Sequence, residues 1–419
     1  MAFDAPWYKM ISLRDNGSLA AIEGLIEQYG PNTKQHVGEK VYDFNFSPDH
    51  HLYGIPTGGA YGSTSGVVLR EDLRAKYGAP EPDGNVGVSS MEPFLKAIKE
   101  HEPDMIPLAL TYTGWSLANR LWQQVHFWGG YPGFIFPDIL KDTKYVDFET
   151  IQEWRDNAKL CHEWWKQGLV NKEDVGGTAG ETIASTIFAT GKTAAYLEAE
   201  PDFKYPEAGK MVKSNFPEAE AKGYDLTGIR VGKVKGLGAL KQWNFVVFNA
   251  GAPQEQQVAG IQFFNWLHGS QDNMDIWLMG VDGKNYKKEP NMRFSEIPGV
   301  DATRNYRRMP YVGGCGLQVM RQPVDIPQYA MDTFIHRTVE SNWVFNPYEA
   351  YEPNTKVLEV ELAALQGVQA EAEYGITTGQ KPPEESIPFY TKTLDGAGRQ
   401  NVKQKLQKQF DDWLAANKK

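Results

Sequence analysis

Residues 67–78 read VVLREDLRAKYG, an apolar run that passes directly into charged residues. The run 67–70 is typical of a buried strand, and residues 71–77 are typical of a short helix. The same alternation continues along the chain. Further helices are predicted at 18–29, 90–100, 181–190, 254–268 and 271–279, and further strands at 41–46, 51–56, 106–110, 193–197 and 245–248. Alternating helices and short apolar strands favour the α/β class.

Two long segments have the pattern of an amphipathic helix. The first spans 148–167 and is followed by Gly168, and the second spans 398–416. Their apolar positions, at spacings of three and four, are Ile151, Trp154, Ala158, Cys161 and Trp165 in the first and Val402, Leu406, Phe410 and Leu414 in the second. The other face of the second helix carries Lys and Gln, so we expect it to lie on a domain surface.

Length, charge and cysteine content restrict the class of protein. A chain of 419 residues is long enough for two or three domains, and none of its apolar runs approaches the length of a membrane span. Its 43 basic and 53 acidic residues leave a net charge of −10, which argues against nucleic acid as the main partner. Cys161 and Cys315 are too few for a disulfide framework or a structural zinc site.

The motifs that hold cofactors, metals or a nucleophile do not match. Residues 190–193 read TGKT, but Thr186 stands where a phosphate-binding loop needs a glycine. A predicted helix runs into Gly191, so this glycine is expected to cap that helix. The eight histidines show no spacing typical of metal ligands, and residues 62–66 (GSTSG) do not match a serine nucleophile turn. The sequence therefore predicts no cofactor and no metal.

Glu198 and Glu200 follow the predicted strand 193–197. Two acids at i and i+2 share one face of a strand and could act as acid and base on a glycoside. The pair could equally form a polar loop at a strand end. It could also bind a ligand without catalysis, by accepting hydrogen bonds from it. The sequence leaves these three interpretations open.

Aromatic residues are abundant, with 12 Trp, 20 Tyr and 20 Phe. Trp154, Trp165 and Trp413 lie within periodic helices and are assigned to the core. Aromatic residues in loops are better candidates for a ligand site, because a ring offers a flat apolar face that suits the C–H face of a sugar. These candidates are Trp7, Tyr8, Tyr61, Tyr112, Trp115, Trp128, Trp243 and Trp343.

Short segments spread over nearly the whole chain carry a family resemblance. They are FDAPW (3–7), NGSL (16–19) and LIEQY (25–29); LYGIP (52–56), VVLREDL (67–73) and KYG (76–78); FATGKTAA (188–195); FNWL (264–267) and GVDGKNY (280–286); and WVF (343–345) and ELAA (361–364). In this order they resemble bacterial extracellular solute-binding proteins of ABC importers (family 1). The resemblance is to the sugar-binding lipoprotein group that ends in a distinctive C-terminal domain.

The resemblance implies a two-lobe periplasmic-binding-protein-like fold of class II, with hinges near 62–66 and 247–251. Lobe 1 would comprise 1–64 and 248–290, and lobe 2 would comprise 65–247. Residues 291–419 would form a C-terminal helical region that packs on lobe 2 and the hinge. Family members begin with a signal peptide and further strands of lobe 1, so here the first lobe is expected to be truncated and to leave an unpaired sheet edge.

The resemblance also implies a function. The chain would be no enzyme but a monomeric extracellular component that captures a carbohydrate, by its aromatic content an oligosaccharide, in the cleft and delivers it to the membrane permease. A lipid anchor would hold it at the extracellular face of the cell membrane. By position, the ligand contacts would be Asp4, Trp7, Tyr8, Tyr61, Thr113, Trp115, Trp128, Glu198, Glu200, Trp243, Asn244 and Trp343. The alternatives are a glycoside hydrolase that uses Glu198 and Glu200, a binder of peptide or another non-sugar solute, and a fragment without function.

Overall fold

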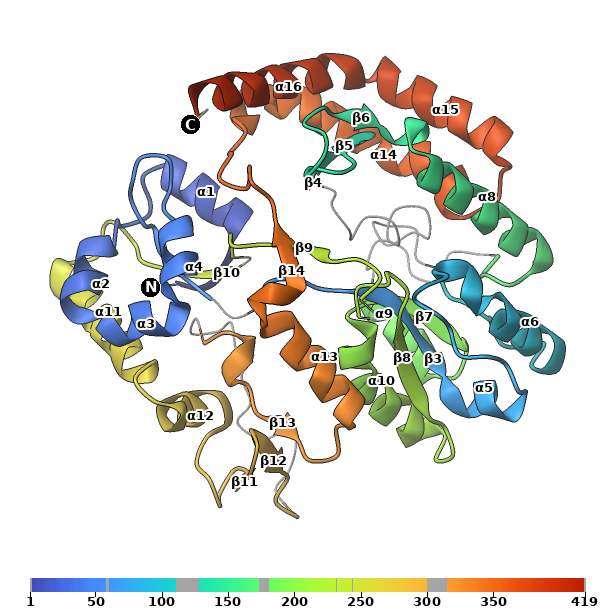
Figure 1. The fold of residues 1–419 in the computed structure, drawn as a ribbon, viewed down its shortest axis with the longest axis horizontal. Coiled ribbons are helices and arrows are strands. Elements are labelled where there is room, and N and C mark those ends of the chain that lie inside the picture. Colours follow the sequence, from blue (N-terminus) through green and yellow to red (C-terminus); the bar gives the residue numbers. More distant parts are fainter. Residues whose placement is uncertain are drawn as a thin grey trace. The chain divides into compact units, whose positions relative to one another are not determined.

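The computed structural model describes residues 2–57, 60–110, 128–172, 181–230, 232–242, 244–299 and 315–417 (Figure 1). The chain divides into two compact units. Unit 1 consists of Met1–Gly62 and Gly238–Ser341, and unit 2 consists of Ser63–Leu237 and Asn342–Lys419. The prediction placed the corresponding boundaries after residues 64, 247 and 290. Each unit is thus assembled from two segments that are distant in sequence.

Unit 1 is built on a three-stranded antiparallel sheet with the order β1-β10-β2. Its strands are β1 (Ala2–Pro6), β10 (Asn244–Val247) and β2 (Gly54–Pro56). Its helices include α1 (Trp7–Asp15), α2 (Glu23–Tyr29), α3 (Pro31–Val37), α4 (Glu39–Phe44), α11 (Gln254–Leu267) and α12 (Gln271–Met279). Met10, Phe245 and Val247 are buried together, so α1 packs on the central strand.

The rest of unit 1 is a small sheet with the order β11-β12-β13, followed by helix α13. These elements are β11 (Lys287–Glu289), β12 (Arg293–Ser295), β13 (Gln322–Pro323) and α13 (Gln328–Thr338). Arg321, directly before β13, forms a buried ion pair with Asp275 of α12, with 2.8 Å between Nε and Oδ2. This pair connects the small sheet to the helices of unit 1.

Unit 2 contains a sheet with the order β7-β3-β8, in which β3 is antiparallel to both neighbours. The strands are β3 (Ser65–Arg70), β7 (Ala195–Ala199) and β8 (Ala221–Asp225). The helices around it are α5 (Glu71–Lys76), α6 (Glu92–His101), α8 (Gln152–Gln167), α9 (Glu181–Ala189) and α10 (Pro201–Asn215). Val67, Leu69 and Leu197 lie in one core with Trp164 of α8, as expected for a strand that is buried along its whole length.

The C-terminal part of unit 2 forms a second core with a small antiparallel sheet, β4-β5-β6 (Figure 1). The elements are β4 (Trp128–Tyr131), β5 (Phe134–Phe136), β6 (Val146–Asp147), α14 (Glu359–Thr377), α15 (Pro383–Gly396) and α16 (Arg399–Ala416). Val402, Leu406 and Phe410 of α16 are fully buried. The predicted apolar face of the last helix is therefore confirmed.

One predicted element is wrong and one is confirmed. Residues 41–46 were predicted as a strand, but most of them lie in helix α4. Short apolar runs fit either structure, and here Val41 and Tyr42 are buried while Asp43 is exposed. Gly191 lies two residues after the end of α9, has a φ of 73° and donates its N–H to the Phe188 carbonyl oxygen at 3.0 Å, so its predicted role as a helix cap is confirmed. No helix in the described ranges is long and apolar enough to cross a membrane.

Candidate functional site

The sheet of unit 2 has a polar edge where several strands end. Because β3 is antiparallel to β7 and β8, its first residue lies beside the last residues of both neighbours. Two further segments run parallel to this sheet, since Ala109 bridges Tyr196 and Leu108 bridges Val170 in parallel register. In open α/β sheets, ligands bind outside the carboxyl ends of the strands. This edge is therefore the candidate site in unit 2.

Two buried acidic residues lie on either side of Gly66 at this edge. Glu198 of β7 and Asp225 of β8 both pair with Gly66, and each is 6% exposed. Asp225 accepts hydrogen bonds from the backbone N–H groups of Thr227 and Arg230, at 2.8 and 2.9 Å. Asp225 thus holds the turn that follows β8. Glu198 is the acid of this pair that the sequence predicted as a ligand contact.

Gly66 allows an unusually close approach of two strands. A Cβ atom at this position would lie 1.9 Å from the Tyr224 carbonyl oxygen and 2.9 Å from the Leu226 nitrogen. Both contacts are with backbone, so a side chain could not be accommodated by rotation of a neighbour. The neighbouring Ser65 hydroxyl is buried and has no hydrogen-bond partner among the described residues. Ser65 is a candidate ligand contact that the sequence did not indicate.

Glu200 does not continue the strand that contains Glu198. β7 ends at Ala199, and Glu200 has a left-handed backbone with φ 57° and ψ 47°. Its N–H donates to the Thr64 carbonyl oxygen at 2.9 Å, and Pro201 then begins α10. The argument that both acids share one strand face is therefore wrong, because it required an extended backbone through Glu200. A non-glycine residue in this conformation is strained, and such strain is frequent at functional sites.

Asn171 fixes the end of another segment at the same edge. Its buried side chain accepts a hydrogen bond from the Leu110 N–H at 2.7 Å and donates to the Leu110 carbonyl oxygen at 3.1 Å. Leu110 is the last described residue before the predicted contacts Thr113 and Trp115, which lie outside the described residues. Asn171 therefore positions the segment that leads to them.

Unit 1 gathers several predicted contacts at one edge of its own sheet. Asn244 at the start of β10 pairs with Pro6 at the end of β1, next to Trp7. The Asn244 carbonyl oxygen accepts hydrogen bonds from the N–H and Oγ1 of Thr57, at 3.1 and 2.7 Å. The backbone places Asp4, Trp7 and Tyr8 at or near this edge; their side chains, and all of Trp243, lie outside the described parts.

Of three further predicted contacts, two lie apart from these edges, and for the third only the backbone is described. Tyr61 is half-buried, and its carbonyl oxygen accepts a hydrogen bond from the Ala239 N–H at 2.7 Å. Burial, with a smaller effect from Glu340, raises the pKa of its hydroxyl. Trp343 is 4% exposed, and its ring packs directly over Gly236, so it is a core side chain here. Trp128 begins β4, but its side chain lies outside the described parts.

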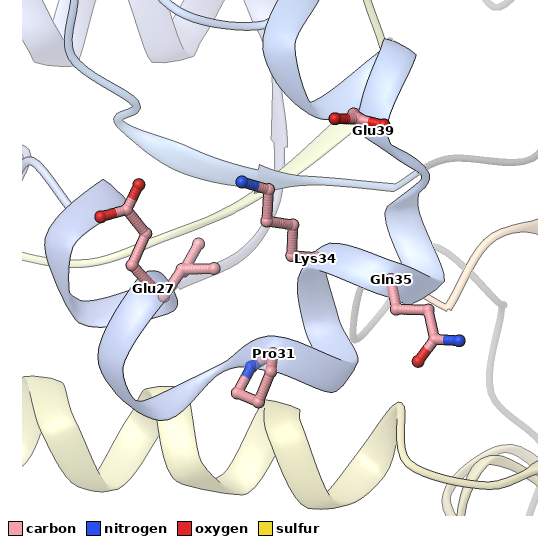
Figure 2. Close-up of a pocket in the computed structure, with 6 residues that line it drawn as sticks. Glu27, Pro31, Lys34, Gln35 and Glu39 are labelled. Carbon is pink, nitrogen blue, oxygen red and sulfur yellow. The ribbon is translucent and has the colours of Figure 1, made fainter.

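A separate hollow of about 480 Å³ lies on unit 1 and contains none of the predicted contacts. Figure 2 shows that its labelled residues, Glu27, Pro31, Lys34, Gln35 and Glu39, come from the short helices α2 to α4. The Lys34 ammonium lies 4.9 Å from the centre of the Tyr42 ring. The hollow is a surface depression lined by Ile26 and Pro31 together with charged and amide side chains, and it carries no ligand assignment.

Comparisons with known proteins agree with this fold. A curated carbohydrate ABC transporter substrate-binding protein of Streptococcus pneumoniae serotype 4 is 22% identical over 379 residues, which cover 88% of this chain and 70% of that protein. Residues 347–415 match the family model described as a domain of unknown function, DUF3502. This match covers the segment from just after β14 (Trp343–Phe345) to the end of α16.

Solved structures extend the likeness to the whole chain. The N-glycan transport solute-binding protein NgtS of Streptococcus pneumoniae has a TM-score of 0.77 at 18% identity, over 100% of this chain and 87% of its own. The alginate-binding protein AlgQ2, in a structure described as without calcium ion, has a TM-score of 0.58 at 18% identity, over 96% and 84%. These findings confirm the predicted resemblance to sugar-binding proteins of ABC importers and the predicted α/β two-lobe fold class.

Proposed function

We propose that this chain is the solute-binding component of an ABC importer and that it captures a carbohydrate of oligosaccharide size. The observation that carries the proposal is the likeness in fold, over 100% of the chain, to a solute-binding protein for N-glycan transport. The similarity in sequence to a carbohydrate ABC transporter substrate-binding protein supports it. Delivery to a membrane permease, a monomeric state and a lipid anchor at the extracellular face of the membrane belong to the same proposal.

The chemistry of the two sheet edges is suited to a sugar. In unit 2 we propose that Glu198, Glu200 and the Ser65 hydroxyl accept or exchange hydrogen bonds with sugar hydroxyls. Carboxylates bind hydroxyl hydrogens strongly, and a buried hydroxyl without a partner gains most from a new one. In unit 1 we propose contacts from Asn244 and from Trp7, with aromatic rings stacking on pyranose faces. The other proposed contacts are Asp4, Tyr8, Tyr61, Thr113, Trp115, Trp128 and Trp243.

The test is a titration of the purified chain with saccharides, in which binding is measured by tryptophan fluorescence and by calorimetry. The ligands are N-glycan fragments, alginate oligosaccharides and fructo-oligosaccharides, with the component monosaccharides and a set of short peptides as comparisons. We expect saturable binding of at least one oligosaccharide class and weaker binding of its monosaccharide. Binding of peptides with no response to any saccharide would overturn the proposal.

A matched pair of variants tests the role of Glu198. Glu198→Gln keeps the size of the side chain but removes the charge, and we expect affinity to fall by about 10-fold or more, since a hydrogen bond to a charged group contributes about 1.5–3 kcal/mol. Glu163→Gln is the control, because Glu163 lies exposed on α8 beside Lys166. Equal effects of the two substitutions would remove Glu198 from the site.

The same incubations address the hydrolase alternative. A glycoside hydrolase would release reducing sugar from the bound oligosaccharide, whereas a binding protein returns it intact. We expect no release, and the left-handed backbone at Glu200 takes away the strand-face geometry on which the alternative was based. Reducing sugar that appears with the wild type and is lost in Glu198→Gln would instead establish an enzyme.

A further inference from the structure

The chain passes between its two units three times. These three crossings lie at residues 62–63, 237–238 and 341–342. A hinge between two units consists of a few residues of such crossings, which absorb the change in backbone angles. The contacts that hold each crossing within its unit therefore decide how independently the three segments can move.

On the unit 1 side, Arg337 holds the first crossing through both its backbone and its side chain. Its carbonyl oxygen accepts a hydrogen bond from the Tyr61 N–H at 2.9 Å, and its side-chain Nε donates to the Gly62 carbonyl oxygen at 3.1 Å. Gly62 is the last residue of unit 1 before the first crossing. Arg337 itself belongs to the last turn of α13, which ends shortly before the third crossing. Arg337 thus connects the first crossing to the third.

Tyr61 connects the first crossing to the second. Its carbonyl oxygen accepts a hydrogen bond at 2.7 Å from the N–H of Ala239, the residue that directly follows the second crossing. Asn45, at the end of α4, holds the same segment further along. Its amide nitrogen donates to the Leu240 carbonyl oxygen at 2.9 Å, and its Oδ1 accepts from the Gln242 N–H at 3.1 Å. The three segments therefore leave unit 1 connected to one another.

Unit 2 holds the other side of each crossing in its own way. Gly236 directly precedes the second crossing and Trp343 directly follows the third, and a Cβ atom at Gly236 would lie 2.7 Å from the Trp343 ring. After the first crossing, the Thr64 carbonyl oxygen accepts the hydrogen bond from the Glu200 N–H at 2.9 Å. Only a few residues of each crossing lie between these contacts and those in unit 1.

The position of the Arg337 side chain is costly for a cation. It is 7% exposed, and a guanidinium at this depth loses hydration that its hydrogen bonds must replace. An apolar side chain of similar length would fill the same space without that loss. What the guanidinium adds is a hydrogen bond from an ionised donor to Gly62, which is stronger than one from a neutral donor.

We propose that Arg337 is a positioning residue for saccharide binding. It joins the three crossings on the unit 1 side and thereby holds Tyr61, one of the proposed ligand contacts, in place. This inference rests on the proposed function, in which Tyr61 contacts the saccharide. Segments that are already joined in the free chain need less ordering when the ligand binds. Loss of the Arg337 side chain should therefore weaken binding although no ligand contact is removed.

The experiment measures saccharide affinity by calorimetry and amide hydrogen exchange in the ligand-free full chain. R337M keeps the length of the side chain and removes its donors. We expect the affinity of R337M to fall by about 3- to 10-fold, the range for one lost hydrogen bond. Exchange in residues 61–64 and 236–241 should become faster by about 5-fold or more, whereas β10 and α11 should keep their protection.

R293M is the matched control within unit 1. Arg293 of β12 also donates to backbone carbonyl oxygens, those of Pro323 and Ile326 at 2.8 and 3.1 Å, but it lies at no crossing. R293M should lower the midpoint of thermal unfolding without changing the affinity or the exchange at the crossings. R337K keeps the charge but lacks the Nε donor, so it should fold even if R337M does not and should change the same quantities in the same direction.

The outcomes separate this inference from the proposed function. Wild-type affinity in both R337M and R337K would overturn the inference, and so would an equal loss of affinity in R293M. Unchanged exchange at the crossings in both Arg337 variants would overturn it as well. If the wild type binds no saccharide, the proposed function fails. Faster exchange confined to the crossings would then still support the connection made by Arg337, and unchanged exchange would refute it.

Discussion

At the scale of single residues, Gly66 sets the geometry of the candidate site. A Cβ atom at this position would overlap the backbone of β8, at 1.9 Å from the Tyr224 carbonyl oxygen. We expect Gly66→Ala to lower the free energy of unfolding by at least about 2 kcal/mol, because the strands must separate. Affinity for the saccharide should fall as well, since Glu198 and Ser65 lie beside Gly66. Urea unfolding and the saccharide titration measure the two effects.

A second glycine provides the control for this substitution. Gly367 lies in the interior of α14, and a Cβ atom there would meet nothing within 4 Å. Gly367→Ala should raise the free energy of unfolding by about 0.5–1 kcal/mol, because glycine weakens a helix interior relative to alanine. If Gly66→Ala unfolds at the same urea concentration as the wild type, the close approach of β3 and β8 is not a constraint on the fold.

Glu373 is a residue whose effect should depend on pH. Its carboxyl group is buried on α14, with a hydrogen bond from Gln369 Nε2 at 2.9 Å. Burial raises its pKa to about 7, against about 4.5 in the unfolded chain. Its folded form therefore keeps a proton between these two values that the unfolded chain releases. This contribution to stability is complete below about pH 4.5 and is lost as the pH rises to about 7.

The variant Glu373→Gln should remove this dependence on pH. At pH 8 we expect its free energy of unfolding to exceed that of the wild type by about 2–3 kcal/mol, and near pH 4 the difference should be close to zero. Urea unfolding at a series of pH values measures the difference. Glu371→Gln on the exposed side of the same helix is the control and should follow the wild type. A constant difference between Glu373→Gln and the wild type at every pH would contradict the assignment.

At the scale of elements, periodicity predicted helices better than strands. The helices expected at 254–268 and 271–279 match α11 and α12 closely, because a long amphipathic or capped segment has a distinct repeat. Residues 41–46 were assigned to a strand and lie mostly in α4, since a run of a few apolar residues fits both structures. The sequence alone contained no feature that distinguishes a strand from a helix at residues 41–46.

The candidate site could be predicted only in part, for a reason that lies in the topology. Glu198 was identified because it follows an apolar run, and the structure places it next to the last residue of β7. Ser65 and Asn171 were missed. Each can be recognised as a candidate site residue only once it is known that β3, β7 and the segment ending at Leu110 meet at one edge. The left-handed backbone of Glu200 was also invisible, because a residue before proline is normally extended.

At the scale of the whole molecule, the last segment of the chain completes a unit that begins far earlier in the sequence. Residues 342–419 belong to unit 2, and their helices bury Tyr390 and Phe410 against Phe136 and Trp154. These side chains share one core, so neither the small sheet nor α8 can cover its apolar face without the C-terminal helices. The DUF3502 segment is thus part of the folding unit and no appendage.

Deletion of residues 342–419 should therefore damage unit 2 and spare unit 1. We expect the shortened chain to bind the hydrophobic dye ANS and to lose part of its cooperative unfolding transition, since a large apolar surface is exposed to water. A milder variant, Phe410→Ala, should cost about 3–5 kcal/mol, whereas Val360→Ala, at a side chain that is 80% exposed, should cost about 0.5 kcal/mol or less. Hydrogen exchange separates the two units: protection should fall in β5 and α8 and persist in β10 and α11. Full protection of α8 in the shortened chain would mean that the C-terminal helices are not needed for the core that they cover.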